Sequence, residues 1–154
     1  METDKIIFSE ESPESSHNGI INLIDSAWAE IGHGSLKDKK PNPNFDTYYK
    51  LASAGVLHVI TARLNGEIVG YTTLLITDLM QHSGVKACFV DSMFLKKEHR
   101  KGLTGYRLLK FVENCARTKG AKRLEWGVTI YNDFSPILKR MGYSLESYRY
   151  GGDL

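Results

Sequence analysis

Apolar residues recur every three or four positions in two segments of the first third of the chain. The first segment is residues 20–31, after a polar turn centred on residues 12–14, and the second is residues 45–52. This spacing is typical of helices that bury one face. Asn42 can cap the second helix and Pro43 can occupy its first position, so we expect that helix to begin there.

Two further helices are predicted in the second half of the chain. One follows a basic turn at residues 100–105, ends near Gly120, and buries Leu108, Leu109, Val112, Cys115 and Ala116. The other is short, with Ser135 as its cap, Pro136 as its first residue and Gly142 just past its end. Proline and glycine are favoured at those two positions of a helix.

Six runs rich in β-branched and aromatic residues predict strands, at residues 5–8, 56–64, 67–77, 85–95, 122–130 and 143–150. Asn65-Gly66 joins the second run to the third, which is typical of a tight antiparallel hairpin. The pattern therefore predicts an α+β fold with a central, mostly antiparallel sheet of about six strands flanked by helices. With 154 residues, 42% of them hydrophobic, we expect a single domain over residues 1–154.

Charge is concentrated in one place. Residues 96–110 hold six Lys and Arg side chains against one Glu, a local charge of six minus one, or +5, in a chain whose net charge is +2. The remainder is then −3. Such a distribution favours a local anionic ligand over general adhesion to nucleic acid.

The two cysteines, Cys88 and Cys115, lie in apolar surroundings without the spacing of a metal site, so we expect buried, reduced thiols and no metal. The amino-terminal residues lack the basic start and apolar core of a signal peptide, and no apolar run approaches the length of a membrane span. We therefore expect a cytosolic protein without a membrane partner.

The basic turn precedes a helix, and the start of a helix offers unpaired N–H groups that suit a phosphate or pyrophosphate. The residues concerned are Arg100, Lys101, Gly102, Leu103, Thr104, Gly105 and Tyr106. The two glycines permit close approach of a ligand, and Lys96, Lys97 and Arg107 add positive charge. The alternative is a solvated basic loop before an ordinary amphipathic helix.

The order of elements, together with Arg100, Gly102 and Gly105, resembles the GNAT superfamily of N-acetyltransferases. That family's signature is Arg or Gln, two residues, Gly, one residue, and then Gly or Ala; here Leu103 stands where the inner Gly is expected. Met141-Gly142-Tyr143 also matches the family's closing Gly-aromatic pair. The chain also resembles small single-domain members of this family that are encoded by phages.

The resemblance implies acetyl-CoA as co-substrate and an amine as acceptor. It also implies that the sheet splays between the fourth and fifth strands, where the backbone at Phe94 and Leu95 pairs with the pantetheine arm. Residues 100–106 would hold the pyrophosphate. Asn132 matches an asparagine that the family uses near the arm, with a plain turn role as the alternative.

Asp91, four residues before Leu95, matches the position where many family members carry a glutamate base. A carboxylate desolvated within an apolar strand is a better base near neutral pH, and its shorter side chain suggests action through a water. The alternative is that Asp91 faces solvent or pairs with a neighbouring strand. The family's acid is usually a tyrosine on the last helix. Tyr131 is the nearest phenol, with packing as its alternative role.

His33 and His82 are candidates to line the acceptor site, with an ordinary loop role as the alternative for each. Only twelve residues follow Gly142, too few for the hairpin that usually closes the family's acceptor wall. We therefore expect either an open site for a macromolecular amine or a homodimer. Two other functions remain open, a CoA-binding protein without turnover and a nucleic-acid-binding protein.

Overall fold

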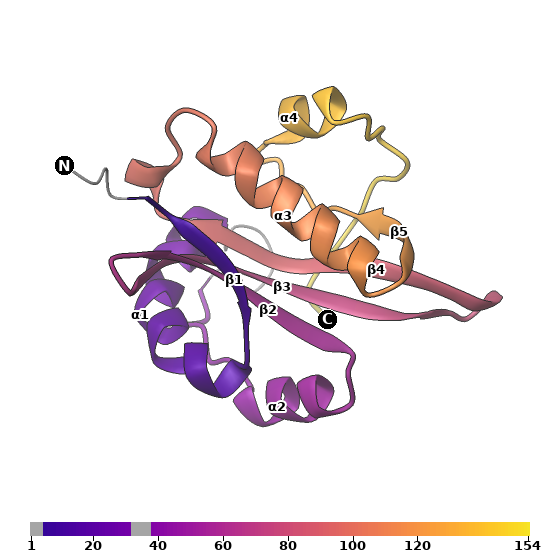
Figure 1. The fold of residues 1–154 in the computed structure, drawn as a ribbon, viewed down its shortest axis with the longest axis horizontal. Helices are drawn as coiled ribbons and strands as arrows, with labels where there is room; N and C mark the ends of the chain where they lie inside the picture. The colour runs from indigo at the N-terminus through magenta and orange to yellow at the C-terminus, as the bar shows by residue number, and fades with distance from the viewer. Residues whose placement is uncertain (1–4, 32–37) are drawn as a thin grey trace. The chain divides into compact units, whose positions relative to one another are not determined.

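The computed structural model describes residues 5–31 and 38–154. Their elements, in chain order, are β1 (Ile7–Glu11), α1 (Pro13–Ile31), α2 (Phe45–Ser53), β2 (Leu57–Leu64), β3 (Glu67–Leu79), β4 (His82–Leu95), a short 3₁₀ helix η1 (Lys97–His99), α3 (Thr104–Thr118), β5 (Ala121–Glu125) and α4 (Ser135–Arg140) (Figure 1).

The strands form one sheet in the order β1-β2-β3-β4-β5. The first three pairs are antiparallel, and β4 and β5 are parallel, so the predicted mostly antiparallel sheet flanked by helices is confirmed. The predicted sixth strand is wrong, because residues 143–150 form no strand. Leu145, Tyr148 and Tyr150 are exposed there. Alternating side chains make a strand only when a partner strand and a packed face are available.

The hairpin between β2 and β3 forms as predicted. Leu64 pairs with Glu67, which leaves Asn65 and Gly66 as the two turn residues. Both have positive φ, 51° and 85°. This conformation matches the twist of antiparallel strands, and asparagine and glycine are the residues that adopt it most easily.

The sheet has helices on both faces (Figure 1). On one face α3 contributes Leu108, Val112 and Ala116 to a core with sheet residues Ile60, Leu74, Ile76 and Cys88. On the other face lie α2 and the first part of α1, which approaches β3 closely at Gly19. The buried face predicted for α3 is confirmed except at Cys115, which is half-buried.

Three predicted helix starts are shifted. Pro13 begins α1 instead of lying in a turn, and the hydroxyl of Ser12 accepts a hydrogen bond from the Ser15 amide (3.2 Å). Asn44, two residues after the predicted cap, accepts the bond from the Thr47 amide (3.2 Å) and starts α2. Ser135 is the first residue of α4 rather than its cap. Asparagine, serine and proline occur at several positions near these starts, so their presence alone does not determine which residue begins each helix.

The described residues group into two compact units. Residues up to 23 together with 44–127 contain the sheet, α2 and α3, while residues 24–43 together with 128–154 contain α4. Within the second unit, Gly142 follows α4 with a φ of 97°, as its predicted position just past the helix requires.

Neither cysteine is in a disulfide. Cys88, on β4, is fully buried, and burial raises the pKa of its thiol to about 12. Cys115, on α3, is half-buried, and burial together with the nearby Glu10 carboxylate raises its pKa as well. The expectation of a buried thiol therefore holds fully for Cys88 and only in part for Cys115.

Gly19→Ala is expected to destabilise the protein by up to about 2 kcal/mol, because the overpacking cost of about 1–3 kcal/mol exceeds the gain of about 1 kcal/mol from replacing a helical glycine. An added Cβ would lie 2.5 Å from Cδ1 and 3.0 Å from Cβ of Ile68. Gly105→Ala is the matched control, since a Cβ there meets nothing within 4 Å and alanine favours a helix over glycine. Urea unfolding measures both variants; equal stability changes would show that α1 does not need the close approach.

Candidate active site

The sheet opens between β4 and β5. Their pairing runs from Lys86 and Ala121 to Phe89 and Glu125, where β5 ends, whereas β4 continues to Leu95. Residues 90–95 of β4 therefore have no partner on β5, and the predicted splay is observed. Phe94 and Leu95 lie on this freed part with buried side chains. Its backbone can pair with an extended, amide-bearing ligand.

The turn after β4 leads into α3 through two glycines with different roles. Gly102 has a φ of 62°, a left-handed conformation that favours glycine. A Cβ added to Gly105 meets nothing within 4 Å, so the fold alone leaves open space at that position. Leu103, the cap position, is 71% exposed and provides no side-chain cap. The N–H groups of Gly105 and Tyr106, in the first turn, have no acceptor within the helix.

The Arg100 side chain connects this turn to the end of β4. Its Nε donates a hydrogen bond to the Leu95 carbonyl (2.7 Å), and its guanidinium carbon lies 5.5 Å from the centre of the Phe94 ring. Part of the Arg100 donor capacity is therefore used within the fold, at the same strand end that carries the two predicted pantetheine-binding residues.

Asp91 sits in a β-bulge. Thr73 pairs with Ser92 and Leu74 pairs with Val90, which leaves Asp91 as the extra residue of β4. A bulge re-aims the side chain, and Asp91 is exposed rather than buried as the strand pattern suggests. One carboxylate oxygen accepts a hydrogen bond from the Thr73 hydroxyl (3.1 Å). That hydroxyl also lies 2.6 Å from the Ser92 hydroxyl.

The charge of Asp91 influences the pKa of two tyrosines. Burial, followed by the charge of Asp91, raises the pKa of Tyr48 on α2. Burial, followed by Tyr48 and Asp91, raises the pKa of Tyr71 on β3 to about 12. Both phenols therefore stay neutral at physiological pH. Neither makes a hydrogen bond to a residue that the structure describes. The exposed Asp91 carboxylate is available to a cationic amine.

A model of the acetyltransferase (GNAT) family matches residues 20–143. The chain belongs to the GNAT family. An aminoglycoside acetyltransferase from an uncultured soil metagenomic sample, solved with sisomicin, is similar in fold (TM-score 0.74, 13% identity, 97% of this chain and 96% of that chain).

Two other solved structures are similar in fold to this GNAT chain. They are ribosomal-protein-alanine N-acetyltransferase from Brucella melitensis biovar Abortus 2308 (TM-score 0.71, 14% identity, 97% of this chain and 99% of that chain) and glucosamine-6-phosphate N-acetyltransferase from Arabidopsis thaliana (TM-score 0.72, 13% identity, 97% and 98%). No curated protein sequence matches the chain.

The two candidates of the GNAT site that follow β5 lie in the second compact unit. Tyr131 is 55% exposed. The Asn132 amide donates to the carbonyl (3.3 Å) and the hydroxyl (3.2 Å) of Thr129, which fits the turn role. On α4, Leu138 is buried and Lys139 is exposed, and neither is the tyrosine that the resemblance leads us to expect. An acid role for Tyr131 and an arm-binding role for Asn132 stay predictions.

The two histidine candidates have different outcomes. His33 lies outside the described residues. His82 is the first residue of β4, nine residues before Asp91, and this length of strand spans about 30 Å. His82 therefore lies far along β4 from Asp91, and its role in lining the acceptor site stays a prediction.

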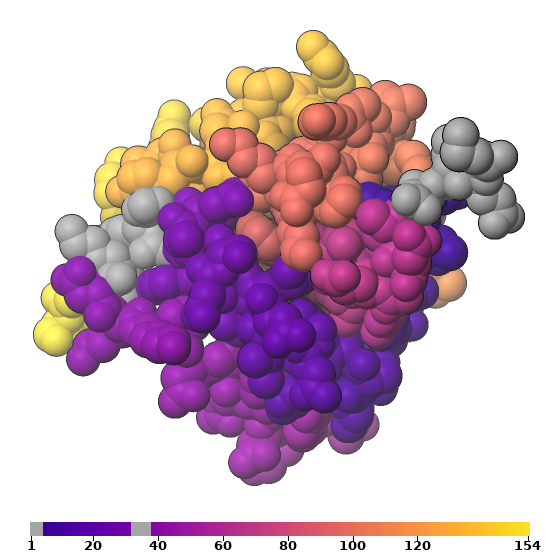
Figure 2. Space-filling view, turned by 90° about the vertical axis from the view of Figure 1, so that its left-hand side faces the viewer, coloured from indigo at the N-terminus to yellow at the C-terminus, as the bar shows by residue number. Residues whose placement is uncertain are grey.

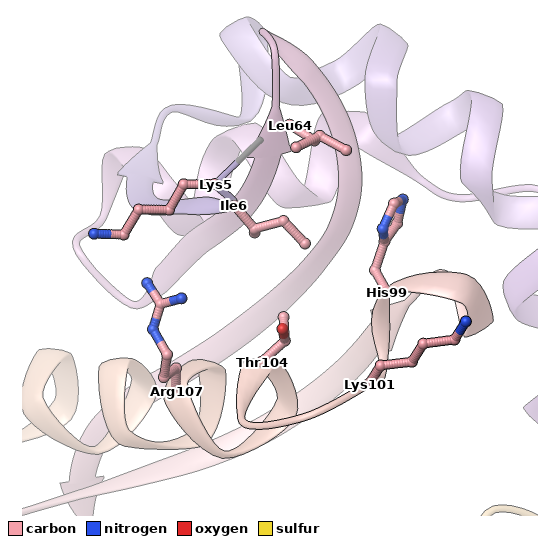
Figure 3. A pocket seen from close by; sticks show the side chains of 7 residues that line it. All are labelled: Lys5, Ile6, Leu64, His99, Lys101, Thr104 and Arg107. Atoms are coloured by element: carbon pink, nitrogen blue, oxygen red, sulfur yellow. The ribbon is translucent and has the colours of Figure 1, made fainter. Parts of the chain in front are cut away.

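A cavity of about 290 Å³ lies beside the first turn of α3 and is lined by Lys5, Ile6, Leu64, His99, Lys101, Thr104 and Arg107 (Figure 3). Figure 2 shows the turn before α3, in salmon, against the β2–β3 hairpin, in magenta. Arg107 points to this side, with its guanidinium carbon 5.5 Å from the centre of the Phe8 ring of β1. The sequence suggested Lys101 and Thr104 only for the pyrophosphate and missed their neighbours from β1 and β2.

Among the described residues, no cluster of three or more His, Cys, Asp or Glu side chains is arranged to hold a metal ion. The helices in the same part of the chain are too short or too polar to cross a membrane.

Proposed function

We propose that this GNAT chain is an acetyl-CoA-dependent N-acetyltransferase that moves the acetyl group directly to an amine. The observation that carries the proposal is the separation of β4 from β5, with Asp91 in a bulge at the start of the freed part of β4. The gap offers a place for an extended thioester, and the bulge offers a base beside it.

Acetyl-CoA supplies the acetyl group as an activated thioester. The residues fit its parts: backbone groups near Phe94 and Leu95 would pair with the amide-bearing arm, and the N–H groups of Gly105 and Tyr106 would face the pyrophosphate. The open space at Gly105 supports close approach of a ligand, since nothing within the fold fills it.

Asp91 would act as the base. An alkyl amine with a pKa near 10.4 is about 99.9% protonated at pH 7, and the cation cannot attack a carbonyl carbon. Asp91 accepts the amine proton directly or through a water, a carbon–nitrogen bond forms, and the carbon–sulfur bond breaks to release CoA as thiolate. The nitrogen then loses its second proton to solvent, and the thiolate takes a proton from solvent.

The acceptor is proposed to be a cationic amine that approaches between Tyr48, Tyr71 and Asp91. The aromatic rings can contact its charged form, and the Asp91 carboxylate can pair with it before the proton leaves. The similar enzymes bear the names of aminoglycoside, ribosomal-protein-alanine and glucosamine-6-phosphate acetyltransferases, which supports an amine but not a particular one. A macromolecular acceptor, a homodimer, a cytosolic location and a likeness to phage-encoded members stay predictions.

The first test is ligand binding followed by turnover. Millimolar CoA or acetyl-CoA should raise Tm, and a panel of amines should release free thiol above the hydrolysis blank. Absence of any shift would rule out the coenzyme and with it the proposed function. A shift without thiol release from any amine would favour the rival function, a CoA-binding protein without turnover. The lack of a tyrosine on α4 is the observation that supports this rival.

A further inference from the structure

The cavity beside α3 is lined by polar side chains on one side and by two apolar side chains on the other. Figure 3 shows Arg107 and His99 rising on either side of Thr104, with Ile6 and Leu64 opposite. The lining includes no carboxylate. We propose that this cavity binds the phosphate group of a small molecule, at a site separate from the proposed coenzyme groove.

The charge of the cavity is uncompensated within the described part of the chain. Lys5, His99, Lys101 and Arg107 make no ion pair with any residue described there. Other basic side chains of the same unit are paired, for example Arg63 with Glu11 (2.6 Å), Lys110 with Glu113 (2.6 Å) and Lys119 with Glu10 (3.0 Å). Three permanent cations around one cavity repel one another, and a dianion between them removes that cost.

The position of the cavity separates it from the gap between β4 and β5. Its strand residues are Ile6, next to β1, and Leu64, at the end of β2. β2, whose end carries Leu64, and β4, whose freed part borders the gap, are two strand spacings or roughly 10 Å apart. Arg107 is held over Phe8 of β1 and so points away from the gap. A phosphate in the cavity and a coenzyme in the gap would lie on different sides of the turn before α3.

The lining indicates what kind of molecule carries the phosphate. Arg107 can donate paired hydrogen bonds to phosphate oxygens, and the Thr104 hydroxyl can add another. Ile6 and Leu64 form an apolar wall that a free anion does not need. The volume of about 290 Å³ is close to the lower end for small-molecule sites and exceeds the needs of phosphate alone. A small phosphate monoester fits this lining, because its phosphate can contact the basic side chains and its carbon atoms can contact Ile6 and Leu64.

Calorimetric titration of the full chain tests this proposal, with inorganic phosphate and glycerol 3-phosphate as probes at low ionic strength. We expect saturable binding at one site, with glycerol 3-phosphate the tighter ligand. Arg107→Gln should weaken it about tenfold, the effect of losing one strong charge-assisted hydrogen bond. Lys110→Gln, which removes one charge from the same helix outside the cavity, is the matched control and should change the affinity less than about twofold.

Three results would overturn the proposal. They are no saturable binding of either probe, equal weakening by Arg107→Gln and Lys110→Gln, and displacement of the bound phosphate by CoA, which would assign the cavity to the coenzyme. Stronger binding of inorganic phosphate than of glycerol 3-phosphate would reject the organic part of the ligand. Phosphate binding by a chain that binds no CoA would support this site while removing the proposed acetyltransferase function.

Discussion

Asp91→Asn is expected to lower kcat/KM for acetyl transfer to an alkyl amine by about 100-fold or more at neutral pH, the range for loss of a positioned general base. Asparagine is nearly the same size as aspartate, but its amide does not take up the amine proton. The activity of the variant should rise with pH, by about tenfold per unit below the amine pKa near 10.4, because the free amine becomes available without a base. The wild-type profile should be flatter. Initial rates from pH 6.5 to 9.5, a range of about three pH units that stays below this pKa, measure both.

Asp78→Asn is the control for this variant, because Asp78 is an exposed carboxylate on β3 that pairs across from Lys86, away from the bulge. It should leave the profile unchanged. The Tm shift caused by CoA should also be the same in Asp91→Asn as in the wild type, since Asp91 acts on the acceptor. Wild-type rates in Asp91→Asn at neutral pH would exclude this residue as the base.

Gly105→Trp is expected to abolish the Tm shift caused by CoA and to weaken CoA binding by at least about 100-fold, or about 2.7 kcal/mol. The indole would occupy the open space at the first turn of α3, where the pyrophosphate is proposed to bind. Because a side chain there meets no neighbour within 4 Å of its Cβ, the Tm without ligand should stay close to that of the wild type. Differential scanning fluorimetry and calorimetric titration give both quantities.

Gly105→Ala separates the blocking effect from loss of the glycine itself. The methyl group is small, and the family signature accepts Gly or Ala at this position, so CoA binding should persist. If Gly105→Trp binds CoA as well as the wild type does, the pyrophosphate does not lie at this turn, and the coenzyme site has to be sought elsewhere.

The sequence predicts those parts of the fold whose signals are local. Asn65-Gly66 specifies a hairpin because few other residues accept two consecutive positive φ angles. The α3 helix follows from its apolar spacing, and the end of α4 from Gly142. In each case the deciding interaction lies within a few residues along the chain.

Non-local structure is where the prediction fails. Residues 143–150 have the composition of a strand but gain no partner, and nothing within those residues reveals this. The bulge at Asp91 arises from the pairing of β3 with β4, and the exposed side chain, bonded to Thr73, matches the alternative that the sequence left open rather than a desolvated carboxylate. The charge of Asp91 raises the pKa of Tyr48 and Tyr71, which lie on a helix and a strand distant from it in sequence. Lys5 and Arg107 likewise meet at one cavity only after folding.

The two cysteines determine how cleanly turnover can be followed with a chromogenic disulfide reagent, which reacts with thiolate. Cys88 is fully buried with a pKa of about 12, and the pKa of Cys115 is also raised. Both side chains therefore stay protonated and slow to react near neutral pH. Colour that develops with native protein then reports released CoA, and denaturant at the end of a run exposes two thiols per chain, a built-in standard for enzyme concentration.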